Sequence, residues 1–264
     1  MRILVTNDDG IHAEGLAVLE KIAGDLSDEV WVCAPEFEQS GASRALTLSE
    51  PLRVRRIEPR RFAVLGTPTD CVMLAVQQLM GDARPDLVLS GVNRGLNAAE
   101  DVTMSGTVAG AIEAMSLGVP AIALSQRMSY GPADNVAPFE AAETFGAGLV
   151  AKLVELGWPN EVILNINFPA GPAREVREVE VTRQGFRDVL TRYAERRTDL
   201  RGRDYYWLGY RTAAQAPADG TDLRAADEGR ISVTPLHIDL THMPTVRALA
   251  GAVGGAIPKL KARA

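Results

Sequence analysis

The chain has 264 residues, of which 46% are hydrophobic and 23% charged, a composition typical of a soluble globular protein with a sizeable core. Its 34 acidic and 28 basic side chains give a formal net charge of -6, which argues against long nucleic acid as a partner. The sequence contains no stretch as apolar as a membrane span and no recognisable signal peptide, so we expect a cytoplasmic protein without a membrane partner.

The first two thirds of the chain alternate between short apolar runs and helical patterns. Mostly apolar segments at 3–5, 29–34, 85–90, 121–124 and 162–168 predict strands, and weaker strands are expected at 52–57 and 62–65. Helical spacing predicts helices over 16–23, 71–80, 106–117 and 138–156. This alternation predicts an α/β fold with a doubly wound, mostly parallel sheet.

The character of the chain changes after about residue 170. Seven arginines and few apolar residues lie in 183–203, which predicts an exposed arm or hairpin at about those positions. Strands are expected at 205–208 and 230–234, and about 242–264 forms a tail with an amphipathic pattern suited to packing on a partner subunit. No clear linker divides the chain, so we expect residues 1–264 to form a single domain.

Two adjacent carboxylates follow the first predicted strand. The strand must end at Asn7-Asp8-Asp9-Gly10, because Asx residues and glycine form turns. Asp8 and Asp9 repel each other at the end of a buried strand and are most easily kept there by a cation. A divalent ion with oxygen ligands is the natural candidate, and an ordinary acidic surface turn is the alternative.

Further oxygen-bearing side chains fall at the same predicted sheet edge. Ser40 lies in the loop after the second strand, and Asn93 lies just after the strand that ends at Ser90. Ligands of open parallel sheets bind beyond the carboxyl ends of the strands, where these residues meet Asp8 and Asp9. Two carboxylates, a hydroxyl and an amide oxygen suit Mg²⁺ or Mn²⁺, whereas the three histidines show no zinc-ligand spacing.

A second candidate element is Ser105-Gly106-Thr107, at the start of a helix of small residues. Unpaired N–H groups at a helix N-terminus suit a phosphate, although Ser105 or Thr107 is equally suited to ordinary N-capping. Asn97, in the preceding glycine-rich loop, either binds a phosphate oxygen or shapes the turn. Both interpretations stay open at this point.

Several familiar catalytic motifs are absent from the sequence. It contains no Walker-type loop, no GxGxxG and no GxSxG nucleophile elbow. Phosphatases of the haloacid dehalogenase type carry DxDG after their first strand, but Asn7 stands here in place of the nucleophilic aspartate. That difference argues against an aspartyl-phosphate mechanism.

Seven segments between Met1 and about Thr241 carry a resemblance to a known family: ILVTNDDGIHAEGL, SGASRALTL, GTPTDCV, PDLVLSGVNRGLN, SGTVAGAIEA, LNINFP and GTDLRAADEGRISVTPLHIDLT. With these segments, which occur in the family's order, the sequence resembles the SurE family of metal-dependent 5′/3′-nucleotidases. One departure is Arg230, where the family usually has an aromatic residue, which puts the local packing or a subunit contact in doubt.

The resemblance implies a Rossmann-like core with a projecting β-hairpin and a C-terminal extension used in homodimer or homotetramer assembly. It implies one divalent metal per subunit, held by Asp8, Asp9, Ser40 and Asn93, and nucleoside monophosphates as substrates. The sequence does not distinguish Mg²⁺ from Mn²⁺, a 5′ from a 3′ phosphate, or purine from pyrimidine bases.

Our main hypothesis is therefore hydrolysis of a nucleoside monophosphate by metal-activated water. Asp8 and Asp9 are the catalytic residues, and Asn97, Ser105, Gly106 and Thr107 are the candidates for phosphate binding. Two alternatives remain: a nucleotide- or metal-binding regulator without turnover, and an arginine-rich arm that recruits short polyanions such as polyphosphate.

Overall fold

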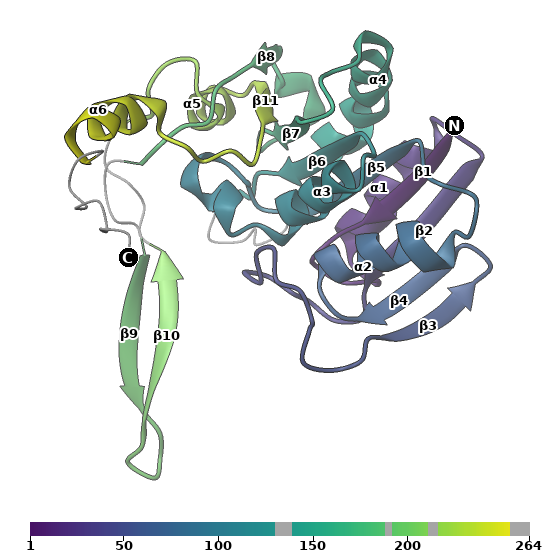
Figure 1. Cartoon of the computed structure of the whole chain (residues 1–264), viewed down its shortest axis with the longest axis horizontal. Helices are drawn as coiled ribbons and strands as arrows, with labels where there is room; N and C mark the ends of the chain where they lie inside the picture. Colours follow the sequence, from purple (N-terminus) through teal and green to yellow (C-terminus); the bar gives the residue numbers. More distant parts are fainter. Residues whose placement is uncertain (130–138, 188–191, 211–215, 254–264) are drawn as a thin grey trace, which may run out of the picture.

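The structure is a computed structural model that describes residues 1–129, 139–187, 192–210 and 216–253. Within these residues, nine strands form one sheet through the middle of the molecule (Figure 1). They are β1 (Arg2–Thr6), β2 (Glu29–Pro35), β3 (Arg53–Glu58), β4 (Arg61–Leu65), β5 (Leu87–Arg94), β6 (Ala121–Gln126), β7 (Ile163–Phe168), β8 (Val179–Val181) and β11 (Ile231–Leu236).

The strand order is β3-β4-β2-β1-β5-β6-β7-β11-β8. Strand β1 pairs in parallel with both β2 and β5, and β5, β6 and β7 continue in the same direction. Only toward the edges does the sheet become mixed, because β3 runs antiparallel to β4 and β11 runs antiparallel to β7. The mostly parallel, doubly wound α/β fold is confirmed, and its topological switch point lies between β1 and β5.

Helices lie on both faces of the sheet. They are α1 (Glu14–Gly24), α2 (Pro68–Leu74), α3 (Gly106–Ser116), α4 (Glu140–Leu156), α5 (Asp222–Asp227) and α6 (Met243–Val253). The predicted helix at 71–80 is α2 followed by a π-helical turn, Ala75–Leu79. Two 3-10 turns occupy Ala99–Thr103 and Ala173–Glu175. Pro138, expected to begin α4, lies outside the described residues.

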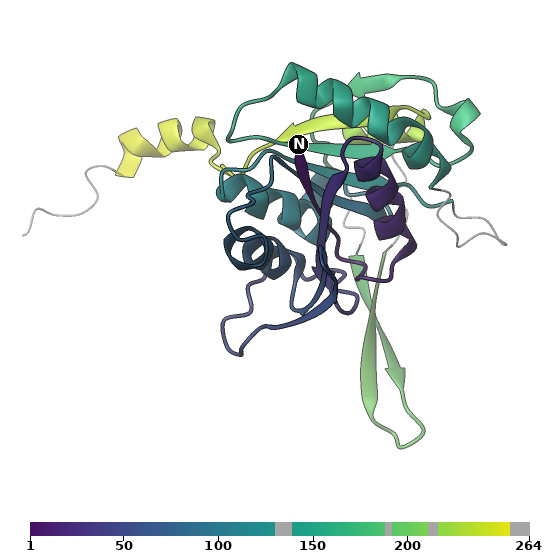
Figure 2. The same ribbon diagram turned by 90° about the vertical axis from the view of Figure 1, so that its right-hand side faces the viewer.

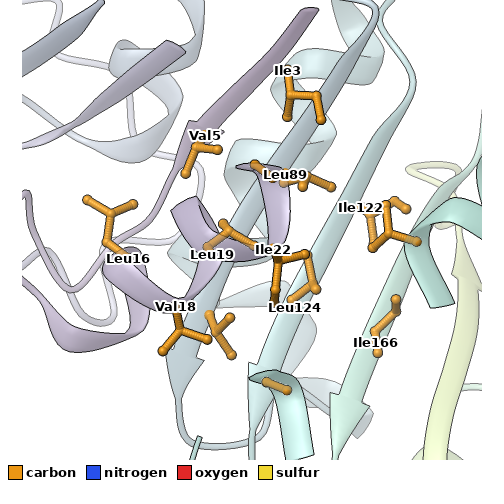
Figure 3. Close-up of a cluster of buried hydrophobic side chains, with 14 of the residues drawn as sticks. Ile3, Val5, Leu16, Val18, Leu19, Ile22, Leu89, Ile122, Leu124 and Ile166 are labelled. Carbon is orange, nitrogen blue, oxygen red and sulfur yellow. The ribbon is translucent and has the colours of Figure 1, made fainter. Parts of the chain in front are cut away.

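The central strand β1 is held by hydrophobic clusters on its two faces. Ile3 and Val5 pack in a cluster with side chains of α1 and α4, whereas Leu4 packs in a cluster with side chains of α2 and α3. Figure 3 shows the first cluster, in which side chains of α1 gather with Ile3 and Val5 of β1 and with side chains of β5, β6 and β7. Each fully buried Leu or Ile stabilises the fold by about 1.5–3 kcal/mol relative to exposure. Because β1 is packed in this way on both faces, the turn at its end has a fixed position in the fold.

The arm differs from the predicted segment in its bounds. Strands β9 (Arg192–Thr198) and β10 (Asp204–Tyr210) form a separate antiparallel hairpin that projects from the body (Figures 1 and 2). The expected arm at about 183–203 begins too early, because the half-buried Arg187 forms ion pairs at the root with Glu100 and Asp101. It also ends too early, because the strand predicted at 205–208 belongs to the hairpin.

The expected tail at about 242–264 contains one helix in its described part. Helix α6 extends away from the sheet (Figure 2), and residues 254–264 lie outside the described residues. None of the helices in the described part of the chain has the length and apolar character of a membrane span.

Strand β5 is longer than the sequence predicts, so Asn93 lies on a strand and not on the following loop. The pairing with β6 shifts between Ser90 and Asn93, after which Asn93 pairs with Ser125. At the shift, Gly91 has a φ of +136°, and a Cβ there would lie 2.1 Å from the carbonyl oxygen of Leu124. Gly91 therefore does not end the strand as predicted; it allows the irregularity through which the strand continues.

Helix α5 begins with a buried carboxylate that joins three segments. Asp222 is 0% exposed and accepts hydrogen bonds, each 2.8 Å long, from the backbone N–H groups of Ala99, Gly185 and Leu223. Burial raises the pKa of the Asp222 carboxyl, and these N–H groups act in the opposite direction. Asp222 thus links the 3-10 turn after β5 to the segment that precedes the arm.

Replacing Asp222 is expected to destabilise the protein. Asp222→Ala leaves buried N–H groups without their acceptor, so the free energy of unfolding should fall by about 2–4 kcal/mol in urea titrations. Asp219→Ala is the matched control, because the Asp219 side chain is 95% exposed, and it should change stability by less than about 0.5 kcal/mol. Equal losses in the two variants would contradict this role of Asp222.

Candidate functional site

The turn after β1 lies at the topological switch point and is built from local hydrogen bonds. The Asn7 side chain donates to the carbonyl oxygen of Gly10 at 2.9 Å and closes the turn. Gly10 has a φ of +101°, and a Cβ there would lie 3.3 Å from the backbone of Phe37. The turn therefore packs directly against the loop that follows β2.

Asp8 is buried against the first turn of α3. Asp8 is 5% exposed, and its carboxylate accepts a 2.6 Å hydrogen bond from the Thr107 hydroxyl. A Cβ on Gly106 would lie 2.7 Å from the Asp8 Cβ, so only glycine lets the helix approach this closely. Burial raises the pKa of Asp8 to about 6; Thr107 opposes the rise, and the charges of Asp9 and Glu38 add to it.

Asp9 is half-buried and is tied to the end of β5. Its carboxylate accepts a hydrogen bond from the backbone N–H of Arg94 at 3.3 Å. Burial raises the pKa of Asp9, the Arg94 N–H lowers it, and the charge of Glu38 raises it further. Two adjacent acids thus occupy a place where the ionised forms are disfavoured.

The segments that carry Ser40 and Asn93 are attached to this turn. The backbone N–H of Gln39 donates to the Asp8 carbonyl oxygen at 2.7 Å, which places the exposed Ser40 beside the turn. Asn93 is half-buried next to Arg94, and its amide nitrogen donates to the Gly95 carbonyl oxygen at 2.9 Å. That contact leaves the amide oxygen of Asn93 as the end available to a ligand.

The donor set fits a hard divalent cation. Among the described residues, no three His, Cys, Asp or Glu side chains cluster as metal ligands. A metal here would be held by the two aspartates and by neutral oxygens, the combination typical of Mg²⁺ and Mn²⁺. The raised pKa of the buried Asp8 shows that its ionisation is costly, and a bound cation would offset that cost.

The four candidate phosphate-binding residues make different contacts. Gly106 and Thr107 touch Asp8, as described above. The Ser105 hydroxyl accepts the Val108 N–H at 3.0 Å and is the N-cap of α3. The Asn97 side chain donates to the Ser125 hydroxyl at 2.9 Å, and its backbone N–H donates to Asn167 at 3.0 Å. Ser105 therefore makes the capping contact, and Asn97 makes contacts that shape its loop.

Glu38 is a residue of the site that sequence reasoning missed. Its carboxylate accepts a 2.7 Å hydrogen bond from the Ser40 hydroxyl, and its charge raises the pKa of both aspartates. The only signal in the sequence was an acidic residue two positions before Ser40, which is not distinctive in a polar loop.

The chain is similar in sequence to proteins of one known family. The profile of the family described as Survival protein SurE matches residues 3–191. A protein of Phenylobacterium zucineum (strain HLK1) named 5′-nucleotidase SurE is 68% identical, over 98% of this chain and 100% of that protein. A protein of the same name from Caulobacter vibrioides (strain NA1000 / CB15N) is 66% identical, over 98% of both chains.

The fold is also similar to a solved structure. The crystal structure of the SurE protein from Aquifex aeolicus has a TM-score of 0.82 and 36% sequence identity, and the match covers 96% of this chain and 99% of that one. Both the profile and the two relatives match well over half of the chain. The chain belongs to the SurE family, as its sequence motifs predict.

Proposed function

We propose that this protein is a 5′-nucleotidase that uses one divalent cation, Mg²⁺ or Mn²⁺, to hydrolyse nucleoside monophosphates to nucleoside and phosphate. Identities of 68 and 66% with two proteins named 5′-nucleotidase SurE support the nucleotidase class. The observation that carries the metal requirement is the buried Asp8 carboxylate, which lies next to Asp9 and against the N-terminus of α3.

In the proposed enzyme, Asp8, Asp9, the Ser40 hydroxyl and the Asn93 amide oxygen hold the cation. When bound, the cation polarises the phosphate and lowers the pKa of water. The Thr107 hydroxyl holds the Asp8 carboxylate in one orientation. Asp9 is the more accessible of the two acids and is therefore the better placed to orient the attacking water as well.

The first turn of α3 is the proposed phosphate cradle. Ser105 caps the Val108 N–H through its hydroxyl and the Ala109 N–H through its carbonyl oxygen. The N–H groups of Gly106 and Thr107 precede the first hydrogen bond within the helix, and they can therefore bind phosphate oxygens. We propose that Ser105 and Asn97 act by shaping this cradle.

The arginine-rich segment does not favour a polyanion as an additional substrate. Four of its seven arginines form ion pairs with carboxylates: Arg187 with Glu100 and Asp101, Arg192 with Asp101, Arg196 with Asp204, and Arg197 with Glu195. Their charge is therefore already partly neutralised within the chain, which matches a salt-bridged arm.

We propose that the β9–β10 hairpin and α6 mediate assembly into a homodimer or homotetramer. The hairpin projects from the body (Figure 1), and β10 exposes large side chains in sequence, namely Tyr205, Tyr206, Trp207 and Leu208. Successive side chains of a strand alternate between its faces, so both faces of the hairpin expose large side chains, which is typical of a protein–protein contact.

The first prediction from this proposal concerns metal-dependent turnover. The intact protein should release phosphate from nucleoside 5′-monophosphates with Mg²⁺ or Mn²⁺ and not with EDTA, and Asp9→Asn should lower the rate by about 100-fold or more. The control is Asp82→Asn, because Asp82 is an exposed acid that precedes β5, whereas the candidate site lies at the carboxyl ends of β1 and β5. A panel of 5′- and 3′-monophosphates with different bases shows in the same assay which phosphate position and which base the enzyme prefers.

Two outcomes would contradict the proposal. Phosphate release that persists in EDTA would show that the reaction needs no divalent cation, and full activity of Asp9→Asn would show that Asp9 does not take part in it. Binding of Mn²⁺ without release from any nucleotide would instead favour a nucleotide- or metal-binding regulator.

The second prediction concerns the close approach of α3 to Asp8. Gly106→Ala places a methyl group 2.7 Å from the Asp8 Cβ and displaces the carboxylate, so kcat/KM for the preferred nucleotide should fall by about 10-fold or more. Gly148→Ala is the matched control, since nothing lies within 4 Å of a Cβ at this exposed position in α4. It should keep full activity and stabilise the helix by about 0.5–1 kcal/mol. Equal activity of the two variants would exclude this packing constraint.

The third prediction concerns assembly. Size-exclusion chromatography with light scattering should give a mass of two or four subunits for the intact protein. The double variant Trp207→Asp/Leu208→Asp should shift the mass toward the monomer, because charges replace the exposed apolar side chains of β10. Leu156→Asp is the control, as Leu156 is an exposed apolar residue at the end of α4. An unchanged mass of the double variant would place the contact elsewhere.

A further inference from the structure

Glu38 lies beside the proposed metal site without belonging to the expected ligands. Its carboxylate oxygen Oε1 accepts the hydrogen bond of the Ser40 hydroxyl at 2.7 Å. The Glu38 carboxylate is therefore in direct contact with a candidate ligand, and the next residue, Gln39, is hydrogen-bonded to the backbone of Asp8.

The backbone on both sides of Glu38 is fixed relative to the turn after β1. The N–H of Gln39 donates to the Asp8 carbonyl oxygen at 2.7 Å, and the N–H of Ala42 donates to the Gln39 carbonyl oxygen at 3.1 Å. A Cβ on Gly10 would lie 3.4 Å from the Glu38 nitrogen. The contact between Glu38 and Ser40 thus occurs in a loop held against the aspartates.

A serine hydroxyl has one proton and two lone pairs, and only a lone pair can bind a cation. The proton must therefore point away from the ion, toward an acceptor of its own. Partners of this kind orient metal ligands and make them stronger donors. In this loop the acceptor is Glu38, which also adds a negative charge near the cation position.

We propose that Glu38 is a positioning residue for the divalent cation: it accepts the Ser40 hydroxyl proton and turns the oxygen lone pairs toward Asp8 and Asp9. This inference rests on the proposed function, because it needs a cation at that place. It adds a partner for one ligand and does not change the ligand set.

The test is a double-mutant cycle on Mn²⁺ affinity, measured on the full chain without substrate. EDTA-stripped protein is titrated with Mn²⁺, and free Mn²⁺ is followed by electron paramagnetic resonance. Glu38→Ala should weaken binding by about 10-fold or more, the size typical for the loss of a ligand's partner. Glu38→Gln keeps an acceptor oxygen without the charge and should weaken it less. In the Ser40→Ala background, the effect of Glu38→Ala should shrink by at least about fivefold, because the hydroxyl through which Glu38 acts is gone.

The matched control is Glu36→Ala. Glu36 is an acid of the same loop, but it pairs with Arg55 at 2.6 Å, and its replacement should leave Mn²⁺ affinity within about twofold. Thermal unfolding followed by circular dichroism shows that each variant is folded. An effect of Glu38→Ala that is the same with and without Ser40 would mean that Glu38 acts by charge alone, and the proposal would be wrong. No effect of Glu38→Ala would also overturn it.

Failure of this inference and failure of the proposed function are distinguishable. Phosphate release by the wild type with Mn²⁺, together with loss of Mn²⁺ binding in Asp9→Asn, establishes the site whatever Glu38 does. Absence of Mn²⁺ binding in the wild type overturns both.

Discussion

The constraint on which the site depends is the placement of Asp8 and Asp9 at the end of a strand buried on both faces. Ionising Asp8 there is costly, because burial removes its solvent. The Thr107 hydroxyl and the positive end of the α3 dipole reduce that cost for Asp8, and the Arg94 N–H reduces it for Asp9. These contacts do not remove the cost of ionisation, since the pKa of both acids stays raised. A cation would offset the remaining cost, and the turn is therefore suited to binding one.

Much of the sheet could be predicted from the sequence, because fully buried parallel strands appear as continuous apolar runs. The runs that became β1, β5 and β6 are examples, and each lies in the core of the sheet. The hairpin was harder to place, since β9 contains few apolar residues and its pairing with β10 depends on cross-strand contacts. The end of β5 was missed for another reason: Gly91 is equally suited to ending a strand and to an irregularity within one.

In the candidate site, too, some residues could be predicted from the sequence and others could not. Asp8 and Asp9 could be predicted because they follow a recognisable strand, and their chemistry depends on residue type. The role of Glu38 could not, because it depends on the side-chain conformation that joins it to Ser40. Asp222 could not be assigned either, since its partners Ala99 and Gly185 lie 123 and 37 positions away in the chain. Contacts of that range are set by tertiary packing and leave no local pattern.

The surroundings of Arg230 differ from those of the candidate site. The guanidinium of Arg230 forms ion pairs with Glu178, Glu180 and Glu228. These contacts lie at the β8–β11 edge of the sheet, with β6 and β7 between that edge and the pair β1 and β5. A partly exposed ion-pair cluster contributes little net stability, so its loss would change the free energy of unfolding only slightly. At the turn after β1 the same freedom does not exist, because an added charge there acts directly on Asp8 and Asp9 and an added methyl on Gly106 would displace Asp8.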